Sequence, residues 1–222
     1  MICWSPKNST DRTKRHSKDS FRDAAWIGFL KEVVGKGASF GSSQKYQNQK
    51  VVVEFVSANP TGPLHIGNAR GGPLGDVIAS LLQAVGYRVT REFYLNDIGG
   101  QIDKLGLSIL ARIGEIVEKK EVDKETIGYQ GEYVKELAQA AIVEHIKQDV
   151  LSLGLFGIEK ITAEIKRDCD DMGIHFDTWV YEKDIVKKTS AIIDSLKKKN
   201  VTQEKDGALW FVPQDEFLND RE

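Results

Sequence analysis

Residues 51–68 have the sequence Val-Val-Val-Glu-Phe-Val-Ser-Ala-Asn-Pro-Thr-Gly-Pro-Leu-His-Ile-Gly-Asn, which joins a strand-like run to a polar turn and the start of a helix. Its opening run, Val51 to Val56, is β-branched or aromatic except for Glu54, which is typical of a parallel strand covered on both faces. A carboxylate in a buried strand is costly unless it has a partner, so we expect Glu54 either at a sheet edge or held beside a cation. Proline and glycine then end the strand, because proline lacks an amide donor and glycine lets the backbone turn.

The turn leads into His65, Ile66, Gly67 and Asn68, after which apolar residues recur at helical spacing. A strand, a polar turn and a helix place backbone N–H groups and the helix dipole opposite an anion at the carboxyl end of a parallel sheet. Gly67 would let a nucleotide lie against the backbone, and His65 and Asn68 can donate hydrogen bonds to its phosphate oxygens. The pattern predicts chemistry at a nucleotide phosphate, although the same four residues also fit a tight turn with a surface histidine.

The helix expected after this turn is strongly amphipathic. Leu74, Val77, Ile78, Leu81, Leu82 and Val85 recur at helical spacing, and we expect this stripe to lie on the sheet. Pro73 falls near the start, where a proline removes one hydrogen bond and clashes with the preceding turn. Either the first turn is separate from the main helix, or the helix kinks at Pro73.

The rest of the chain alternates between strand-like and helical patterns. Alternation over residues 89–95 predicts a second strand, which completes a βαβ unit of a nucleotide-binding fold. Asn96 or Asp97 is expected to cap the helix that follows. Further helices are expected over residues 21–34, 133–146, 158–172 and 185–196, a strand over residues 174–181, and a hairpin over residues 201–212.

Composition sets broad limits on the class of protein. The chain has 222 residues, 41% of them hydrophobic, which suffices for one or two domains with a real core. Its 31 basic and 33 acidic residues nearly cancel, so any contact with nucleic acid must come from a local patch. Cys3 and Cys169 lie far apart without metal-ligand spacing, which favours a reducing, cytoplasmic location. No apolar run approaches the roughly 20 residues that span a bilayer, so no membrane partner is expected.

Residues 53–71, which contain the strand, the turn and the His-Ile-Gly-Asn segment, closely resemble the signature of arginyl-tRNA synthetases. These are class I enzymes whose adenylate site carries a His-Ile-Gly-His motif. Further segments resemble the same family in the family's order, at residues 87–97, 99–102, 131–133, 176–179 and 207–211. The resemblance implies an α/β, Rossmann-like class I catalytic core, here incomplete, with a parallel sheet, helices and a helical and hairpin insertion.

The resemblance also implies a division of the chain. Residues 1–20 are expected to be a disordered leader, since they lack any apolar stripe. Residues 21–50 would be a remnant of the family's amino-terminal domain and a linker, with the helix of residues 21–34 packed against another element. Residues 51–222 would be the amino-terminal half of the catalytic domain, in truncated form.

The implied activity is ATP-dependent activation of arginine to arginyl-adenylate and transfer of arginine to tRNA(Arg), with Mg²⁺ accompanying ATP and no metal site in the chain. Catalysis would consist mainly of positioning and of stabilising charge on the phosphate oxygens, with His65 and Asn68 as the catalytic pair. The resemblance assigns ATP binding to His65, Gly67 and Asn68, and arginine binding to Ser57, Asn59 and Glu54.

Two departures from the family pattern bear on activity. Asn68 stands where most of the family has histidine, and an amide donor without positive charge should stabilise the transition state less. The family's guanidinium-reading residues, second ATP-binding loop and anticodon domain all lie beyond residue 222. We therefore expect the chain to be inactive by itself unless a carboxyl half is supplied in trans.

Other interpretations stay open at the level of sequence. A small nucleotidylyltransferase shares a His-x-Gly-His turn and needs only one such fold, while a non-catalytic interaction module derived from a synthetase needs no turnover at all. Glu54 also has a structural alternative, a pairing within the sheet with an arginine such as Arg91.

Overall fold

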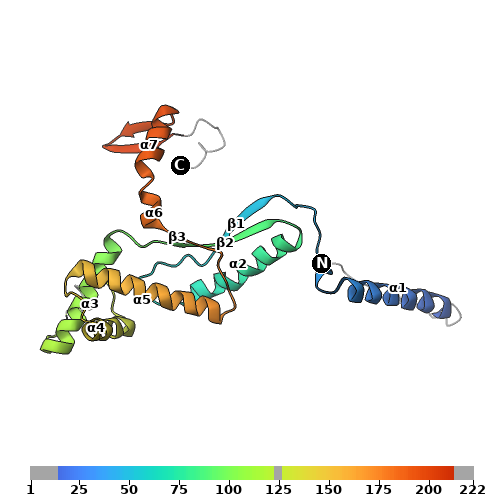
Figure 1. Ribbon diagram of the computed structural model, residues 1–222, viewed down its shortest axis with the longest axis horizontal. Helices are drawn as coiled ribbons and strands as arrows, with labels where there is room; N and C mark the ends of the chain where they lie inside the picture. Colours follow the sequence, from blue (N-terminus) through green and yellow to red (C-terminus); the bar gives the residue numbers. More distant parts are fainter. Residues whose placement is uncertain (1–14, 123–126, 213–222) are drawn as a thin grey trace.

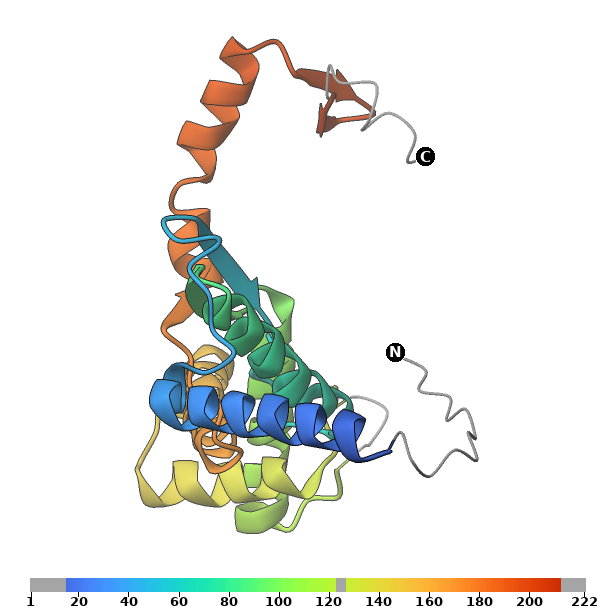
Figure 2. The same cartoon turned by 90° about the vertical axis from the view of Figure 1, so that its right-hand side faces the viewer.

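The computed structural model describes residues 15–122 and 127–212 (Figure 1). Its elements in chain order are α1 (Arg15–Lys36), η2 (Gly37–Ser39), β1 (Lys50–Glu54), α2 (Ile66–Ala84), β2 (Arg88–Leu95), α3 (Gly100–Glu118), α4 (Glu132–Val143), α5 (Val150–Asp171), β3 (Thr178–Tyr181), α6 (Glu182–Val186), α7 (Thr189–Lys198), β4 (Thr202–Lys205) and β5 (Ala208–Phe211). α1 and the segment from α6 to β5 project from a body that the remaining elements form (Figures 1 and 2).

The body contains a three-stranded parallel sheet in the order β1-β2-β3. Val52 of β1 lies opposite Thr90 of β2, and Phe93 of β2 lies opposite Trp179 of β3. α2 connects β1 to β2, which confirms the predicted βαβ unit and the α/β fold class. The expectation that the first strand is covered on both faces is wrong, because the face of β1 that carries Lys50, Val52 and Glu54 is exposed, with Val52 at 57%. β1 is also an edge strand of this sheet.

α2 packs on the sheet through small residues. Gly72, Gly75 and Ala79 are buried, and a Cβ added to Gly75 would collide with the ring of Phe55. The helix can approach the strand this closely only because Gly75 lacks a side chain. The expectation that the large apolar stripe of this helix lies on the sheet is therefore wrong for most of the stripe. Four of its residues are exposed by 43% to 64%, namely Leu74, Val77, Ile78 and Leu81, whereas Leu82 and Val85 are half-buried.

Several element boundaries differ from the expected ones, among them the start of α5 at Val150 rather than at residue 158 and the start of β3 at Thr178 rather than at residue 174. α2 continues without interruption through Pro73, so its first turn is not a separate element. The N-cap of α3 is Gly99, whereas the expected caps, Asn96 and Asp97, accept hydrogen bonds from other groups. The helix expected over residues 185–196 is divided into α6 and α7. The hairpin is confirmed, with its turn between β4 and β5.

The main hydrophobic core lies between the sheet and the helices α3, α4 and α5. α3 and α5 cross closely because Gly106 faces the carbonyl of Val150 and leaves no room for a Cβ. At the sheet, the ring of Phe93 stacks on Trp179 with 4.3 Å between centroids. The fully buried side chains include Phe93, Leu95, Leu105, Ile109, Leu153, Ile161 and Ile165.

α1 begins at Arg15, before the end of the leader expected over residues 1–20; residues 1–14 of that leader lie outside the described residues. The helix carries apolar residues that stay largely open to solvent, such as Trp26 at 63% exposure. Its aromatic contact is between Phe29 and Phe40, just after η2, with ring centroids 5.4 Å apart. None of the helices in residues 15–122 and 127–212 has the length and apolar character needed to cross a membrane.

Candidate active site

The candidate site begins where β1 ends. Val56 and Ser57 have positive φ angles of 65° and 40°, a conformation that is costly for a β-branched residue and turns the chain sharply out of the sheet. The hydroxyl oxygen of Ser57 accepts a hydrogen bond from the backbone N–H of Tyr94 at 3.1 Å. Ser57 thus replaces the backbone acceptor at the end of the β1–β2 ladder, and its own O–H is left to donate elsewhere.

The start of α2 forms another part of the candidate site. The imidazole Nδ1 of His65 accepts a hydrogen bond from the backbone N–H of Gly67 at 3.1 Å, and Asn68 Oδ1 accepts from the backbone N–H of His65 at 3.3 Å. This reciprocal arrangement is a capping box, which satisfies amides at the helix terminus. Because capping uses the acceptor atoms Nδ1 and Oδ1, the donors that remain are His65 Nε2–H and the side-chain amide of Asn68.

These donors lie at the amino terminus of a helix, where the dipole favours negative charge. The local sequence folds this way because His65 caps the helix and Gly67 makes room for its ring: a Cβ on Gly67 would lie 2.9 Å from His65 Cε1. The arrangement is chemically suited to holding a phosphate group.

A cavity of about 420 Å³ lies between the loop after β1, the start of α2 and the segment before α4. It brings together four predicted site residues, which are Ser57, Asn59, His65 and Asn68. The lining also includes Ala58, Thr61, Gly62, Pro63, Tyr129 and Tyr133. Neither Gly67 nor Glu54, the other two predicted site residues, is part of this lining.

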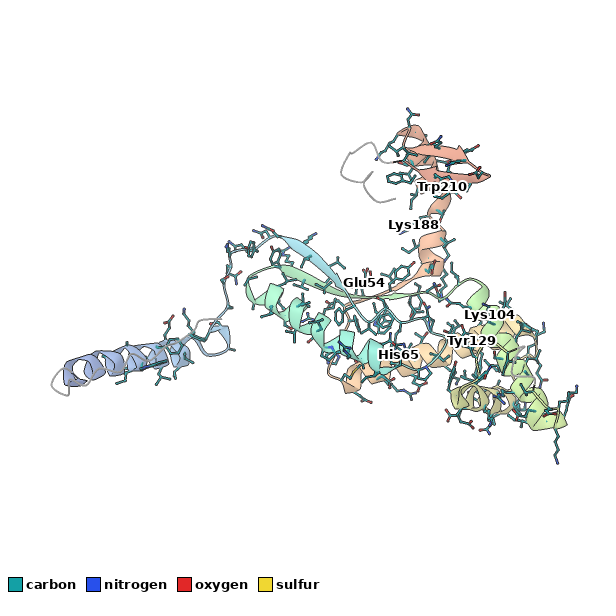
Figure 3. All side chains as sticks on the ribbon, turned by 180° about the vertical axis from the view of Figure 1, so that it is seen from behind. Glu54, His65, Lys104, Tyr129, Lys188 and Trp210 are labelled. Carbon is teal, nitrogen blue, oxygen red and sulfur yellow. The ribbon has the colours of Figure 1, made fainter. Side chains whose placement is uncertain are left out.

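Two tyrosines complete the cavity, and neither was singled out as a site residue from the sequence. The Tyr133 hydroxyl donates to the backbone oxygen of Thr61 at 2.8 Å and so ties α4 to the loop after β1. Burial, with a smaller contribution from Tyr129, raises the pKa of Tyr133 to about 12. Tyr129 lines the same cavity as His65, and both residues are labelled in Figure 3. Tyr133 could have been identified from the sequence, because it lies in residues 131–133, one of the segments that resemble the synthetase family. No sequence feature pointed to Tyr129.

Glu54 lies outside the cavity, exposed at the end of β1 and opposite Glu92 in the strand register. The alternative that Glu54 pairs with Arg91 is wrong. The Arg91 guanidinium instead donates to Asp76 Oδ1 at 2.8 Å and to Ser80 Oγ at 2.9 Å, which fastens β2 to α2. Of the possibilities considered for Glu54, the edge position is the one that the sheet order confirms.

Negative charge gathers near the carboxyl ends of the three strands. The pKa of Tyr94 is raised by burial and by the nearby carboxylates Glu182, Asp97 and Glu54, which follow or end β3, β2 and β1. Asp97 is 5% exposed and binds Lys183 twice, through its ammonium group at 2.9 Å and through its backbone N–H at 3.0 Å. The side-chain hydrogen bond to Asp97, together with the negative charge of Asp97, raises the pKa of Lys183.

A second cavity, of about 540 Å³, opens beside this pair and contains none of the predicted site residues. Lys166 and Tyr181 are part of its lining, and the Lys166 ammonium lies 3.3 Å from the hydroxyl of Tyr181 and 4.7 Å from the centroid of the Trp179 ring. Sequence reasoning missed this cavity, because its polar residues come from the segment after β2 and from α5, β3 and α6, and the first of these is distant in the chain from the others.

The fold and the helix-terminus site together define a class of protein. The sequence model of the catalytic domain of class I tRNA synthetases, arginine type, matches residues 30–220. Curated relatives named arginine–tRNA ligase are 41% identical over 204 residues in Citrifermentans bemidjiense and 38% identical over 191 residues in Helicobacter pylori. The chain belongs to the arginyl-tRNA synthetase family of class I synthetases, a family that uses ATP.

Solved structures agree with this assignment. The crystal structure of an arginyl-tRNA synthetase from Campylobacter jejuni superposes with a TM-score of 0.75 at 33% identity, over 83% of this chain and 42% of that one. The Thermus thermophilus arginyl-tRNA synthetase has a TM-score of 0.54 at 23% identity over 79% of this chain and 32% of its own, and supports the fold alone. The two curated relatives match over 87% and 82% of this chain, which spans only 37% and 35% of their own lengths.

Proposed function

We propose that the chain supplies the amino-terminal half of the catalytic domain of an arginine–tRNA ligase, which activates arginine with ATP and transfers it to tRNA(Arg). The observation that carries the proposal is the convergence of Ser57, Asn59, His65 and Asn68 on one cavity at the carboxyl end of β1 and the amino terminus of α2. In this proposal residues 51–222 belong to the catalytic domain, residues 21–50 are a remnant of an amino-terminal domain with its linker, and the protein works in the cytoplasm.

In the activation step, a carboxylate oxygen of arginine attacks the α-phosphorus of ATP, and pyrophosphate leaves with the electron pair of the broken P–O bond. The chain's contribution is to position the reactants and to stabilise charge on the phosphate oxygens. His65 Nε2–H and the Asn68 amide donate to these oxygens, supported by the dipole of α2. Ser57 and Asn59 hold the α-amino end of arginine from the same cavity.

The two remaining predicted residues have different parts in the proposal. Gly67 lets the nucleotide approach the backbone at the first turn of α2. Glu54, outside the cavity, adds to the negative charge of Asp97 and Glu182 at the sheet's carboxyl edge, and this charge suits the guanidinium group of arginine.

Mg²⁺ would enter on the phosphates of ATP. Within residues 15–122 and 127–212 there is no group of three or more histidine, cysteine, aspartate or glutamate side chains that could hold a metal ion. The alternative of a small nucleotidylyltransferase is not favoured, because the relatives are arginine–tRNA ligases.

The proposal is tested by isothermal titration of residues 1–222 with ATP and with a non-hydrolysable arginyl-adenylate analogue. His65→Asn removes the imidazole donor but keeps a residue that caps helices well. We expect it to weaken binding of both ligands by about tenfold, the loss of one hydrogen bond to a charged group. The matched control is His175→Asn, since His175 is exposed and bonds only to Asp170 among the described contacts.

The proposal is wrong if neither ligand binds, or if both histidine variants bind as the parent does. Arginine-dependent ATP–pyrophosphate exchange, measured with and without tRNA(Arg), then shows whether residues 1–222 activate arginine by themselves. We expect no exchange by residues 1–222 alone. Tight association with tRNA but not with either ligand would instead favour the non-catalytic interaction module.

A further inference from the structure

A polar side chain is completely buried in α3, where the segment before α4 packs on this helix. The Ser108 hydroxyl, at 0% exposure, donates to the backbone oxygen of Lys104 at 2.7 Å and accepts from the backbone N–H of Tyr129 at 3.1 Å. Lys104 and Tyr129 are both labelled in Figure 3. Gly128 packs closely as well, since a Cβ added to it would lie 3.2 Å from Lys104 Cβ. The backbone of residues 128–129 is therefore fixed on α3, although Ser108 itself is outside the lining of the candidate site.

One turn further along α3, Arg112 holds the next residue of the same segment. Arg112 is 6% exposed, and its guanidinium donates to the backbone oxygen of Gln130 at 3.4 Å and to Glu115 Oε2 at 2.6 Å. Its Nε–H has no hydrogen-bond partner among the described residues. A buried donor without a partner costs free energy, so stability alone does not explain an arginine at this position. Its bond to Gln130 gives it a part in holding the segment.

Tyr133, in the first turn of α4, carries this anchorage on to the candidate site. Its hydroxyl donates to the Thr61 oxygen at 2.8 Å, and its ring lies against Gly62, where an added Cβ would be 3.3 Å from the hydroxyl oxygen. The Thr61 N–H in turn donates to the Asn59 oxygen at 2.8 Å. We use the name α3 brace for this series of contacts, which consists of Ser108, Tyr129, Tyr133, Thr61 and Asn59.

The other end of the candidate site is held independently of the α3 brace. His65 and Asn68 fix the start of α2 through their capping box, and Ser57 is held by the backbone of Tyr94. None of these hydrogen bonds involves α3 or α4. Loosening the α3 brace should therefore affect residues 58–64 and leave the donors at the start of α2 in place.

We propose that Ser108 and Tyr133 are positioning residues, which act through the α3 brace to hold Asn59 in the conformation that binds the α-amino end of arginine. The inference rests on the proposed function for the identity of the ligand. It adds two residues that order the site, one of them from outside the cavity. A loop held in this way is ordered before the ligand arrives, so binding does not have to supply the free energy of ordering it.

The test compares Ser108→Ala and Tyr133→Phe in residues 1–222, which break the α3 brace at different points. Alanine removes only the hydroxyl and keeps the helix. The matched control is Thr162→Val, which removes a buried hydroxyl that bonds to a backbone oxygen within α5. Isothermal titration measures the dissociation constants of ATP and of the arginyl-adenylate analogue.

We expect each of the two variants to bind the analogue about fivefold more weakly, the equivalent of one neutral hydrogen bond. Binding of ATP by these variants, and of both ligands by Thr162→Val, should stay within about twofold of the parent, because the start of α2 is unchanged. The double variant should bind the analogue little more weakly than either single variant does. Two independent losses would instead multiply to about 25-fold.

Amide hydrogen exchange gives a readout that needs no ligand. The Thr61 N–H should exchange about fivefold faster in Ser108→Ala, whereas the Gly67 N–H, which His65 holds, should exchange at the parental rate. If Ser108→Ala fails to fold by circular dichroism, the same two measurements are made on Tyr133→Phe.

The inference is overturned if exchange at Thr61 is unchanged, if the variants weaken ATP and the analogue in the same proportion, or if the effects of the two variants multiply. Each of these results would reduce Ser108 and Tyr133 to a purely structural role. A parent protein that binds neither ligand would refute the proposed function, and exchange at Thr61 would still decide whether the α3 brace orders the loop.

Discussion

At the scale of single residues, Tyr133 has a pH signature that can be measured. Its phenol is neutral up to a pKa of about 12 in the folded chain, because burial and Tyr129 disfavour the phenolate, whereas an unfolded tyrosine ionises near 10. The folded state thus keeps the Tyr133 proton to a higher pH than the unfolded state does. The contribution of the neutral phenol to the free energy of unfolding is therefore complete below pH 10 and is lost as the pH rises towards 12.

We expect the free energy of unfolding to fall between pH 9.5 and pH 11.5, and to fall less steeply in Tyr133→Phe over the same interval. Urea unfolding at several pH values measures both slopes. At neutral pH the variant should be less stable by about 1 kcal/mol, since the bond from the hydroxyl to the Thr61 oxygen is lost. Identical slopes for the two proteins would show that Tyr133 is not the group responsible.

The individual site residues were predictable to different degrees. His65 and Asn68 follow from a local pattern, because a capping box depends on residues three positions apart. The acceptor role of Ser57 towards Tyr94 could not be predicted, since it depends on how two strands end side by side and the two residues are 37 positions apart in the chain. Tyr129 reaches the cavity only through the tertiary placement of the segment before α4.

At the scale of elements, the packing of α2 on the sheet predicts opposite effects on stability when two glycines of this helix are replaced by alanine. Gly75→Ala places a Cβ against the ring of Phe55, and such overpacking costs about 1–3 kcal/mol. Gly71→Ala meets nothing within 4 Å and should stabilise the helix by about 0.5–1 kcal/mol. Chemical denaturation measures both values, and a stable Gly75→Ala protein would mean that α2 lies farther from β1 than the structure has it.

The same helix shows why the hydrophobic periodicity predicted a helix at the right place in the chain but predicted the wrong face of it towards the sheet. The spacing of Leu74, Val77, Ile78 and Leu81 indicates a helix with one apolar face, and α2 is that helix. Periodicity does not say what covers that face. The close approach to Phe55 selected the glycine face for the sheet, and the apolar stripe was left for another partner.

At the scale of the whole molecule, stability is concentrated in the body formed by the sheet and by α2 to α5. α1 contacts mainly η2, and the hairpin strands contact mainly each other. By contrast, the segment just before β1 belongs to the body, because Ser43 N–H bonds to the Ala84 oxygen and Tyr46 stacks on Tyr87. A protein of residues 42–186 should therefore retain the cooperative core.

We expect this shortened protein to unfold within about 2 °C of the full chain in scanning calorimetry, because 1 kcal/mol corresponds to roughly 2–4 °C in a domain of this size. Its denaturant m-value should be little changed, since the deleted segments bury little surface against the body. The control is a protein of residues 50–186, which lacks Ser43 and Tyr46 and should melt clearly lower. If residues 42–186 melt more than about 5 °C below the full chain, α1 or the hairpin stabilises the body through contacts that the structure does not contain.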